Sequence, residues 1–321
     1  MKIGTRASAM AIAQTTEIVA QLKKAAPGVQ AEIVKFKPRG DRDQISRLDR
    51  HGGKGGAFVA ELRDAVRQGT LQAAMHSLKD VPGDEECHGL VLGAYLKREQ
   101  VEDTLVLRSD HSLEAFEKAR GAGYKIGTNS VRRGAFLKKL YPACDIIHYR
   151  GAANTRIQKL EDKALQKLPG GGAVGPADGL VMARCGLERV GLAQNISKIF
   201  SAAEMLPAIG QGIVTAECAR TDWESRKLLA QIDDAETRIC ALAEREVLWV
   251  LNGHCNTPIA GRAEISDSVL RLRAAVLSLD GKTNIETSLE GDPLRPRELG
   301  REAGLALLNK GAAKLIAEAN Q

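Results

Sequence analysis

The feature that most constrains the fold of this chain is an alternation of strand-like and helix-like segments along its first two thirds. Residues 7–25 have the spacing of a helix, with Ala11, Ile18 and Leu22 on one face and Ser8 as a candidate N-cap. This order of elements is typical of α/β domains. The further predicted elements are a helix over residues 57–68 and strands over residues 31–36, 71–76, 90–96, 104–107, 145–149 and 180–183.

The C-terminal third follows a different pattern. Residues 269–279 and 283–289 alternate apolar and polar side chains, and the dipeptide Asp280-Gly281 lies between them. Asp-Gly between two alternating segments is a strong signal for a β-hairpin. Because helical patterns flank this pair, we expect a small C-terminal α+β domain with a three-stranded sheet.

Length and charge restrict the function classes. The chain has 321 residues, which suits two or three domains of about 100–200 residues each. Its net charge of +6 favours an anionic ligand. Aromatic residues make up 3% of the chain and offer few surfaces on which bases could stack, so we expect no nucleic acid partner. No segment approaches the roughly 18 apolar residues of a membrane span, so we expect no membrane contact.

The six cysteines are scattered along the chain, without a C-x-x-C pair or a histidine at zinc spacing. We therefore expect neither a metal nor a redox dithiol. Scattered thiols fit a reducing compartment, and the short apolar stretch after Lys2 and Arg6 is too weak for a signal peptide. The expected location is the cytoplasm.

Residues 76–82, His-Ser-Leu-Lys-Asp-Val-Pro, follow a predicted apolar strand. Functional groups of α/β sheets often gather at such strand ends, where Ser77, Lys79 and Asp80 could hold a substrate and move a proton. A lysine beside an aspartate favours the ionised carboxylate, which could stabilise a cation. The alternative is a surface ion pair that closes the strand.

Residues 127–133, Gly-Thr-Asn-Ser-Val-Arg-Arg, lie at a strand-to-helix junction. Thr128 and Ser130 would lie at a helix N-terminus, which attracts anions, and guanidinium groups such as those of Arg132 and Arg133 bind carboxylates or phosphates bidentately. We expect several such arginines to converge between two α/β lobes on a substrate that bears many carboxylates; a solvated basic face is the alternative. Further arginines at predicted junctions are Arg6, Arg150 and Arg156.

Two loops each allow two interpretations. The glycine-rich residues 52–56 lack the Ser or Thr of a phosphate-binding Walker loop, and Lys54 lies either in a solvated mobile loop or in a lid that contacts anions. Cys255 follows His254 in a loop flanked by Gly and Pro. It is either an inert small hydrophobic residue or a reactive thiol.

Taken together and in this order, the motifs resemble the porphobilinogen deaminase (hydroxymethylbilane synthase) family along essentially the whole chain. The resemblance rests on Ile-Gly-Thr-Arg-Ala-Ser at residues 3–8 with Gln14, Arg-Gly-Asp at 39–41, Gly-Gly-Lys-Gly at 52–55, residues 76–82, Gly-Thr and Ser-Val-Arg-Arg within 127–133, Arg-Gly at 150–151 with Thr-Arg at 155–156, Leu-Pro-Ala-Ile-Gly-Gln-Gly at 206–212, and Cys255 with Pro258.

The resemblance implies three domains, of which the first two are α/β lobes similar to those of periplasmic solute-binding proteins. The chain would cross between these lobes near residues 97–102 and 201–206. The implied domains are residues 1–97 plus about 204–221, with the catalytic aspartate and a mobile lid at 39–56; residues 98–203, with the carboxylate-binding arginines; and residues 222–321, with the cofactor cysteine.

The implied activity is that of a transferase of tetrapyrrole (haem) biosynthesis. Four porphobilinogen units are added head to tail to a dipyrromethane cofactor, which the family attaches by a thioether to the residue that matches Cys255. Ammonia is lost at each addition, and water releases hydroxymethylbilane. The resemblance also implies a monomer and suggests that the product passes to uroporphyrinogen-III synthase.

The site residues implied by the resemblance fall into three groups. Asp80 takes the catalytic role, because an ionised carboxylate stabilises the cation left by loss of ammonia and helps to move protons. The implied cofactor-binding residues are Cys255, Lys79, Ser77, Thr128, Ser130, Arg132, Arg133 and Arg156. The implied substrate-binding residues are Arg6, Ser8, Gln14, Arg150, Arg189 and Lys54.

The chain departs from the family pattern at several positions and leaves alternatives open. One is a paralogue of the same fold that binds or processes another anionic pyrrole. Another is a bilobal module that binds an anion without chemistry; the missing export signal and the presence of both Asp80 and Cys255 disfavour it. The departures are Asn129, Ala152, His254, residues 97–100 and a glycine-rich insertion at 169–179.

Overall fold

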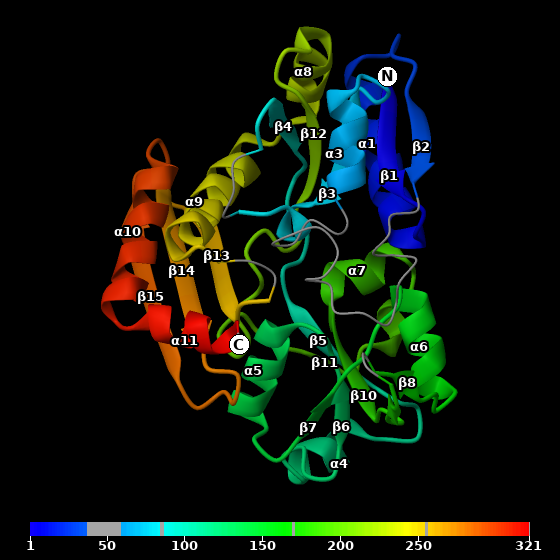
Figure 1. Ribbon diagram of the computed structural model, residues 1–321, viewed down its shortest axis with the longest axis vertical. Helices are drawn as coiled ribbons and strands as arrows, with labels where there is room; N and C mark the ends of the chain where they lie inside the picture. Colours follow the sequence, from blue (N-terminus) through cyan, green and yellow to red (C-terminus); the bar gives the residue numbers. More distant parts are fainter. Residues whose placement is uncertain (37–58, 84–86, 169–170, 254–255, 321) are drawn as a thin grey trace.

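The computed structural model describes residues 1–36, 59–83, 87–168, 171–253 and 256–320. They form two five-stranded sheets, a three-stranded sheet and a two-stranded hairpin. Figure 1 shows the two five-stranded sheets as an upper and a lower lobe, with the three-stranded sheet and its helices beside them. The expected fold class, two α/β lobes and a small C-terminal α+β unit with a three-stranded sheet, is confirmed.

The first lobe is built on a sheet of mixed direction with the strand order β2-β1-β3-β12-β4. β1 pairs in parallel with β2 and β3, whereas β12 runs antiparallel to its neighbours β3 and β4. The elements are β1 (Lys2–Arg6), α1 (Ala9–Ala25), β2 (Glu32–Phe36), α3 (Ala60–Arg67), β3 (Ala73–Ser77), β4 (Leu90–Tyr95), β12 (Val214–Ala219) and α8 (Trp223–Leu229).

Both faces of this sheet are covered by apolar contacts. Met75 packs in the same cluster as Ile18 of α1, while its neighbour Ala74 packs in the cluster of Leu62 of α3. Successive side chains of a strand point to opposite faces, so β3 is buried on both sides and its C-terminal end is held in a fixed position.

The helix expected over residues 7–25 begins two residues later. The amide of Ala7 donates to the carbonyl of Phe36 at 2.9 Å and so continues the β1–β2 ladder. The Ser8 hydroxyl then accepts from the amide of Ala11 at 3.3 Å, which confirms Ser8 as the N-cap of α1.

The second lobe has the strand order β11-β5-β10-β6-β7. β10 pairs antiparallel with β5 and parallel with β6, and β7 adds to β6 in parallel. The elements are β5 (Asp103–Leu107), α4 (Leu113–Lys118), β6 (Lys125–Gly127), α5 (Val131–Leu140), β7 (Asp145–Ile147), α6 (Ala153–Glu161), β10 (Gly179–Ala183), α7 (Arg184–Arg189) and β11 (Lys198–Ile199), with the hairpin of β8 (Gln166–Lys167) and β9 (Ala173–Val174) outside the sheet.

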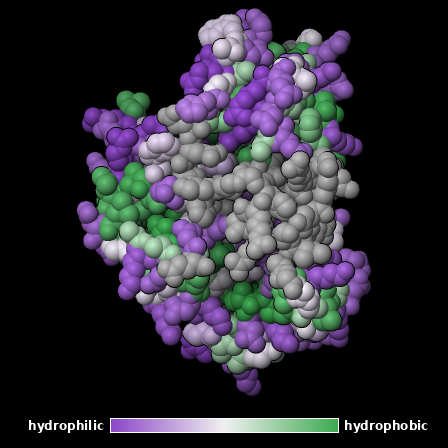
Figure 2. All heavy atoms as spheres, viewed as in Figure 1, coloured by the Kyte–Doolittle hydropathy of each residue, from purple (hydrophilic) through white to green (hydrophobic). Residues whose placement is uncertain are grey.

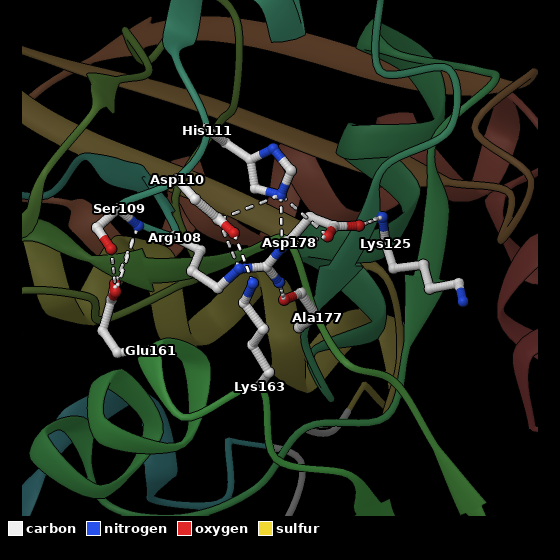
Figure 3. Close-up of polar contacts among 9 residues, drawn as sticks. All are labelled: Arg108, Ser109, Asp110, His111, Lys125, Glu161, Lys163, Ala177 and Asp178. Atoms are coloured by element: carbon white, nitrogen blue, oxygen red, sulfur yellow. Dashed lines mark hydrogen bonds and ion pairs between the residues drawn. The ribbon is translucent and has the colours of Figure 1, made fainter.

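A polar network closes the end of the second lobe where β5 leaves the sheet (Figure 3). The Arg108 guanidinium donates to Asp110 at 2.6 Å, lies 3.2 Å from Asp178 and also donates to the carbonyl of Ala177. His111 Nε2 lies 3.1 Å from Asp178 Oδ1. We call this group, which also includes Lys163 paired with Asp110 at 2.8 Å, the distal network.

The chain crosses between the two sheets twice, from β4 to β5 and back from β11 to β12. The crossings touch, because the amide of Glu99 in the first donates to the carbonyl of Gly212 in the second at 2.9 Å. Gly212 has a φ of +83°, and a Cβ there would lie 2.8 Å from the carbonyl oxygen of Glu99. A side chain would therefore separate the crossings.

The C-terminal unit packs two helices against one face of an antiparallel sheet with the order β13-β14-β15. Its core unites Val247 of α9, Leu272 of β14 and Leu307 of α10. The elements are α9 (Ala235–Leu251), β13 (Ile259–Ser266), β14 (Val269–Leu277), β15 (Asn284–Gly291), α10 (Pro296–Asn309) and α11 (Ala312–Ala319).

A buried ion pair joins this unit to the crossings. Arg98 of the first crossing lies 2.5 Å from Glu244 of α9, whose carboxylate is fully buried. Glu244 also accepts from the amides of Gly210 and Ala263, each at 2.7 Å. Both crossings and β13 are therefore fastened to α9 at one carboxylate.

The expected hairpin at Asp280-Gly281 is confirmed between β14 and β15. Gly281 has a φ of +72°, and a Cβ there would meet the backbone of Lys139 in α5 at 2.4 Å. A glycine is therefore required both for the turn and for the close approach of the hairpin to the second lobe.

The other predicted elements are found with ends shifted by up to two residues, and the part of the helix expected over 57–68 that is described forms α3. No predicted range corresponds to the strands β1, β6, β8, β9, β11, β12 and β13. Figure 2 shows hydrophilic side chains over most of the described surface of both lobes in this view. None of the helices in the described ranges has the length and apolar character that a membrane crossing needs.

Candidate active site

The C-terminal end of β3 presents the polar residues expected from the sequence. β3 ends at Ser77 and continues into a 3-10 turn over Leu78–Asp80. The buried Leu78 anchors this turn in a small core with Tyr95 and Ile213, whereas Lys79 and Asp80 stay partly exposed. The turn therefore fixes the backbone of both charged residues at the edge of the sheet.

Ser77 and Gln14 hold each other in place beside this turn. The Gln14 amide donates to Ser77 Oγ at 3.0 Å, and the Ser77 hydroxyl lies 3.2 Å from Gln14 Oε1. Gln14 lies on α1, so the pair ties that helix to the end of β3. The structure thus brings together two residues that the sequence analysis assigned to different ligands.

Buried charges beneath the turn fasten β3 to its neighbours. His76 Nε2 lies 3.2 Å from Glu217 Oε2 on β12, and Arg63 Nε on α3 lies 3.0 Å from the same oxygen. Burial alone would raise the pKa of Glu217, but His76 and Arg63 lower it to about 2. Glu217 therefore stays ionised and holds the strand that carries Lys79 and Asp80.

A hydrogen-bonded relay connects Lys79 with the second lobe. The Lys79 ammonium donates to Gln211 Oε1 at 3.4 Å, and the Gln211 amide donates to Asp103 Oδ1 at 3.0 Å. Gln211 lies in the crossing from β11 to β12, and Asp103 begins β5. Lys79 is therefore positioned from both lobes at once.

Asp103 is the counter-ion of two arginines in the first turn of α5. Its Oδ2 lies 2.7 Å from Arg132 and its Oδ1 lies 2.8 Å from Arg133. Burial opposes ionisation of Asp103, but the two guanidinium groups bring its pKa down to about 2. Arg132 also donates to the carbonyl of Leu206 at 2.9 Å and is 3% exposed, so this arginine stabilises the interior of the protein.

The N-terminus of α5 has the local geometry of an anion-binding turn. Ser130 caps the helix, since its hydroxyl accepts from the amide of Arg133 at 3.4 Å. The hydroxyl of Thr128 accepts from the amide of Ser130 at 3.1 Å. The helix N-terminus adds its partial positive charge to the nearby cations.

Two cationic side chains, Lys79 and Arg156, are affected by the charges of neighbouring arginines, and we call Lys79, Arg133, Arg150 and Arg156 the cation cluster. Burial lowers the pKa of Arg156 to about 10, and the charges of Arg133 and Arg150 add to this effect. Burial lowers the pKa of Lys79, and Arg133 lowers it further. The cluster joins the end of β3 to α5 and α6, and it concentrates positive charge at the contact between the lobes.

His148 lies at the border of the cation cluster. Burial lowers its pKa, and the charges of Arg150 and Arg156 lower it further. The histidine precedes Tyr149, whose amide donates to the Asn129 side chain at 2.7 Å. Asn129, a departure from the family pattern, thus holds β7 close to the N-terminus of α5.

The remaining predicted residues are of two kinds: those that the structure describes and those that lie outside the described residues. Arg6 ends β1 beside the Ser8 cap, and both are partly exposed. Arg189 ends α7 and is paired with carboxylates of the first lobe and of the crossing. Lys54 and Cys255, together with the predicted lid at residues 39–56, lie outside the described residues.

Three residues of this region were not identified from the sequence: Asp103, Gln211 and His148. Asp103 carried a usable signal, because an aspartate at the start of an apolar strand must be paired when the strand is buried. Gln211 lies in one of the motifs that carried the family resemblance, but nothing in the sequence connects it with Lys79.

The described cysteines are free thiols, namely Cys87, Cys144, Cys185, Cys218 and Cys240. Burial raises the pKa of each of them, to about 11 for Cys144 and Cys218 and about 12 for Cys240. They are therefore poor nucleophiles at neutral pH. Within the described ranges, no group of three or more His, Cys, Asp or Glu could hold a metal ion.

Comparison with known proteins identifies the chain as follows. Residues 1–227 match the model "Porphobilinogen deaminase, dipyromethane cofactor binding domain", and residues 238–309 match "Porphobilinogen deaminase, C-terminal domain". The porphobilinogen deaminase of Syntrophobacter fumaroxidans is 35% identical over 318 residues, which cover 99% of this chain and 97% of the relative. Porphobilinogen deaminase 2 of Streptomyces coelicolor is 37% identical over 318 residues, covering 98% and 96%.

Among solved structures, the putative sulfonate-binding protein SsuA of Methylobacillus flagellatus aligns with a TM-score of 0.41 and 12% identity, covering 78% of this chain and 68% of that chain. The sequence matches extend over both lobes and the C-terminal unit. On this basis the chain belongs to the porphobilinogen deaminase family.

Proposed function

We propose that this protein condenses four porphobilinogen units head to tail on a dipyrromethane cofactor bound to Cys255 and releases the product as hydroxymethylbilane. Each addition loses ammonia, and water ends the series. Family membership over the full chain supports the reaction. The structural observation that carries the proposal is the cation cluster beside Asp80.

The charges of two members of the cation cluster are opposed by their surroundings. Lys79 and Arg156 have lowered pKa values because burial and neighbouring cations disfavour their charged forms. A ligand with several carboxylates offsets this cost through charge-assisted hydrogen bonds. Porphobilinogen and the growing chain, with an acetate and a propionate on each ring, are such ligands.

The residues present fit the dipyrromethane cofactor. Lys79, Arg133 and Arg156 offer the donors that its carboxylates need, and Thr128 and Ser130 lie at the adjacent helix N-terminus. Ser77 and Arg132 border the same region, and Cys255 is the attachment point. When bound, the group supplies the covalent primer to which pyrroles are added.

Asp80 acts on the reacting porphobilinogen. Loss of ammonia leaves a cationic pyrrole, and the carboxylate of Asp80 stabilises this charge and accepts and returns protons at the pyrrole nitrogen. The buried Leu78 fixes the turn, so the carboxylate approaches the pyrrole without reorganisation of the backbone. Lys79 binds a substrate carboxylate beside it.

Incoming units are bound by residues around this centre. Arg6, Ser8, Arg150 and Arg189 lie at or beside strand and helix ends, and Gln14 lies in the second turn of α1. These side chains contact carboxylates or pyrrole N–H groups of the chain. Lys54 contributes from residues 39–56, the lid that closes the site. Each role follows from a match to a family motif.

We also propose the domain boundaries given above: residues 1–97 plus about 204–221, residues 98–203 and residues 222–321. The change of sheet at each crossing supports the boundaries near residues 97 and 204. α8, which the third of these ranges includes, packs on β4 and β12 of the first sheet. The free thiols support a cytoplasmic location. We further propose that the protein is a monomer and that its product passes to uroporphyrinogen-III synthase.

The intact mass of the purified protein under denaturing conditions tests this function. We expect an excess over the bare chain equal to one dipyrromethane, and further increments of one pyrrole unit after brief exposure to porphobilinogen. The Cys255→Ser variant should show the mass of the bare chain, whereas Cys185→Ser, which alters another thiol, should retain the excess.

The same mass measurement can also contradict the proposed function. A mass that stays at the bare chain after incubation with porphobilinogen or with preformed hydroxymethylbilane overturns the proposal. Such a protein would be a paralogue, or an anion-binding module that uses the cation cluster without the primer.

A further inference from the structure

Arg189 connects the two lobes through ion pairs. It is the last residue of α7 in the second lobe. Its Nη2 lies 3.3 Å from Glu17 Oε2 on α1 and 2.5 Å from Glu99 Oε1 in the first crossing. The Arg189 side chain is 10% exposed, so solvent screens these contacts less than it screens a surface pair.

The same arginine lines a cavity at the junction of the lobes. The cavity has a volume of about 330 Å³, and its walls include Arg98, Glu99, Cys185, Glu188 and Arg189. α1 and α7 touch beside it, with Met10 of α1 in contact range of Gly186. The walls of the cavity come from the first crossing and from α7, so a movement of α7 relative to α1 and the crossing would change the access to it.

Negative charge predominates around Arg189, whereas positive charge predominates in the cation cluster. Burial raises the pKa of Glu99, Arg189 lowers it, and Glu17 and Glu188 raise it further. Three carboxylates thus gather around Arg189, and its guanidinium compensates their repulsion. Glu17 and Glu99, which are paired with Arg189, compete with any external carboxylate for that guanidinium.

We infer that Glu17 and Glu99 form an ion-pair clamp with Arg189 that holds the two lobes together and that releases Arg189 when it binds a carboxylate of the growing chain. The release step rests on the proposed function, whereas the clamp itself does not. Glu17 is then a positioning residue: it acts on substrate binding through Arg189.

The clamp can be tested through Cys185, which lines the cavity and is 8% exposed. The experiment measures the rate of alkylation of Cys185 by iodoacetamide in the cofactor-loaded protein, read by mass spectrometry of peptides. In the Glu17→Gln variant, loss of one ion pair should open the lobes more often and raise this rate about threefold, the size expected for one pair. Cys218, fully buried in the first lobe, should react at an unchanged rate in the same sample.

Glu188→Gln is the matched control. Glu188 lines the same cavity and loses the same charge, but its Oε1 accepts from Arg184 Nε of the same helix at 2.8 Å, a contact that stays within α7. We expect its Cys185 rate to stay near that of the parent protein. Equal rates in Glu17→Gln and the parent, or equal increases in both variants, would overturn the clamp.

Porphobilinogen tests the release step. In the parent protein, pyrrole addition should raise the Cys185 rate toward that of Glu17→Gln, and the increase in the variant should be smaller. Intact mass records pyrrole addition separately. A parent protein that gains pyrroles without a change in the Cys185 rate overturns release, whereas one that gains no pyrroles overturns the proposed function and leaves the clamp to the measurement without substrate.

Discussion

The cation cluster and the distal network contain similar residue types in opposite electrostatic states. In the distal network, burial opposes the charge of Arg108, but bonds to Asp110 and Asp178 raise its pKa above the ordinary value. In the cation cluster, burial and neighbouring cations lower the pKa of Arg156. Both arginines lie in the second lobe, so the difference comes from their local partners.

This difference indicates separate roles for the two groups: stability for the distal network and function for the cation cluster. The charges of the distal network are paired within the protein, and the network joins the end of β5 to the segment after α6 and to the segment before β10 (Figure 3). In the cation cluster, burial and neighbouring cations oppose the positive charges, and a bound anionic ligand would offset this cost in free energy. Of the buried Arg108 and the half-buried Arg156, the one whose charge is opposed by its surroundings is the better candidate for binding.

The largest difference between the two groups is expected when the Asp80 carboxylate, beside the cation cluster, is removed. We expect Asp80→Asn to lower kcat by at least about a hundredfold, because the cationic pyrrole loses its stabilising charge. Steady-state turnover measures this, and intact mass should show the cofactor retained. The control is Asp110→Asn in the distal network, which should leave kcat unchanged; turnover of Asp80→Asn within a few-fold of the parent would remove the role of Asp80.

The second test removes one member of the cation cluster. We expect Arg156→Met to lower kcat/KM about ten- to a hundredfold, since a carboxylate of the chain loses a bidentate partner. Its free energy of unfolding should change by less than about 1 kcal/mol, because the lost cation was repelled by Arg133 and Arg150. Kinetics and urea unfolding together check this, and a large loss of stability with normal kinetics would contradict it.

The third test makes the same substitution in the distal network. Arg108→Met should lower the free energy of unfolding by about 2 kcal/mol, because Asp178 and the carbonyl of Ala177 lose a buried donor. We expect kcat/KM to stay within about twofold of the parent protein. If Arg108→Met impaired turnover as much as Arg156→Met, the two groups would not be functionally distinct.

The smallest expected effect is the contribution of Asp110, in the distal network, to the pH dependence of stability. Hydrogen bonds from Lys163 and then Arg108 lower the pKa of Asp110 below its ordinary 3.8. The unfolded chain then binds more protons in this range, so the stabilisation is present above pH 3.8 and is lost as pH falls through the folded pKa. The slope of unfolding free energy against pH below about pH 4 should be shallower in Asp110→Asn; an unchanged slope would contradict the assignment.

The sequence predicted the position of the cationic residues but not their pairing. Arg133, Arg150 and Arg156 each follow a strand, and the carboxyl ends of parallel strands meet at one edge of a sheet. Which of these arginines is paired inside the protein depends on Asp103. This aspartate lies thirty residues before Arg133 and pairs with it only when β5 and α5 pack. Nothing in a twin-arginine motif shows that Arg132 points inward, to Leu206.

The strands that escaped prediction are those whose pattern is least distinctive. β1 has the sequence Lys-Ile-Gly-Thr-Arg, and only three of its residues are buried. β12 is Val-Thr-Ala-Glu-Cys-Ala, in which Glu217 is buried as an ion rather than exposed. A buried carboxylate interrupts the apolar run, and its partners Arg63 and His76 are supplied by distant segments.

The position of β12 has a consequence for the order in which the protein is made. All strands of the second sheet lie between residues 103 and 199, whereas β12, at residues 214–219, fills the place between β3 and β4 in the first sheet. As the chain leaves the ribosome, the second lobe has all its strands before the first lobe does. Until β12 emerges, the edges of β3 and β4 lack their partner and are open to wrong pairing, so the lobe synthesised first is the one that finishes folding later.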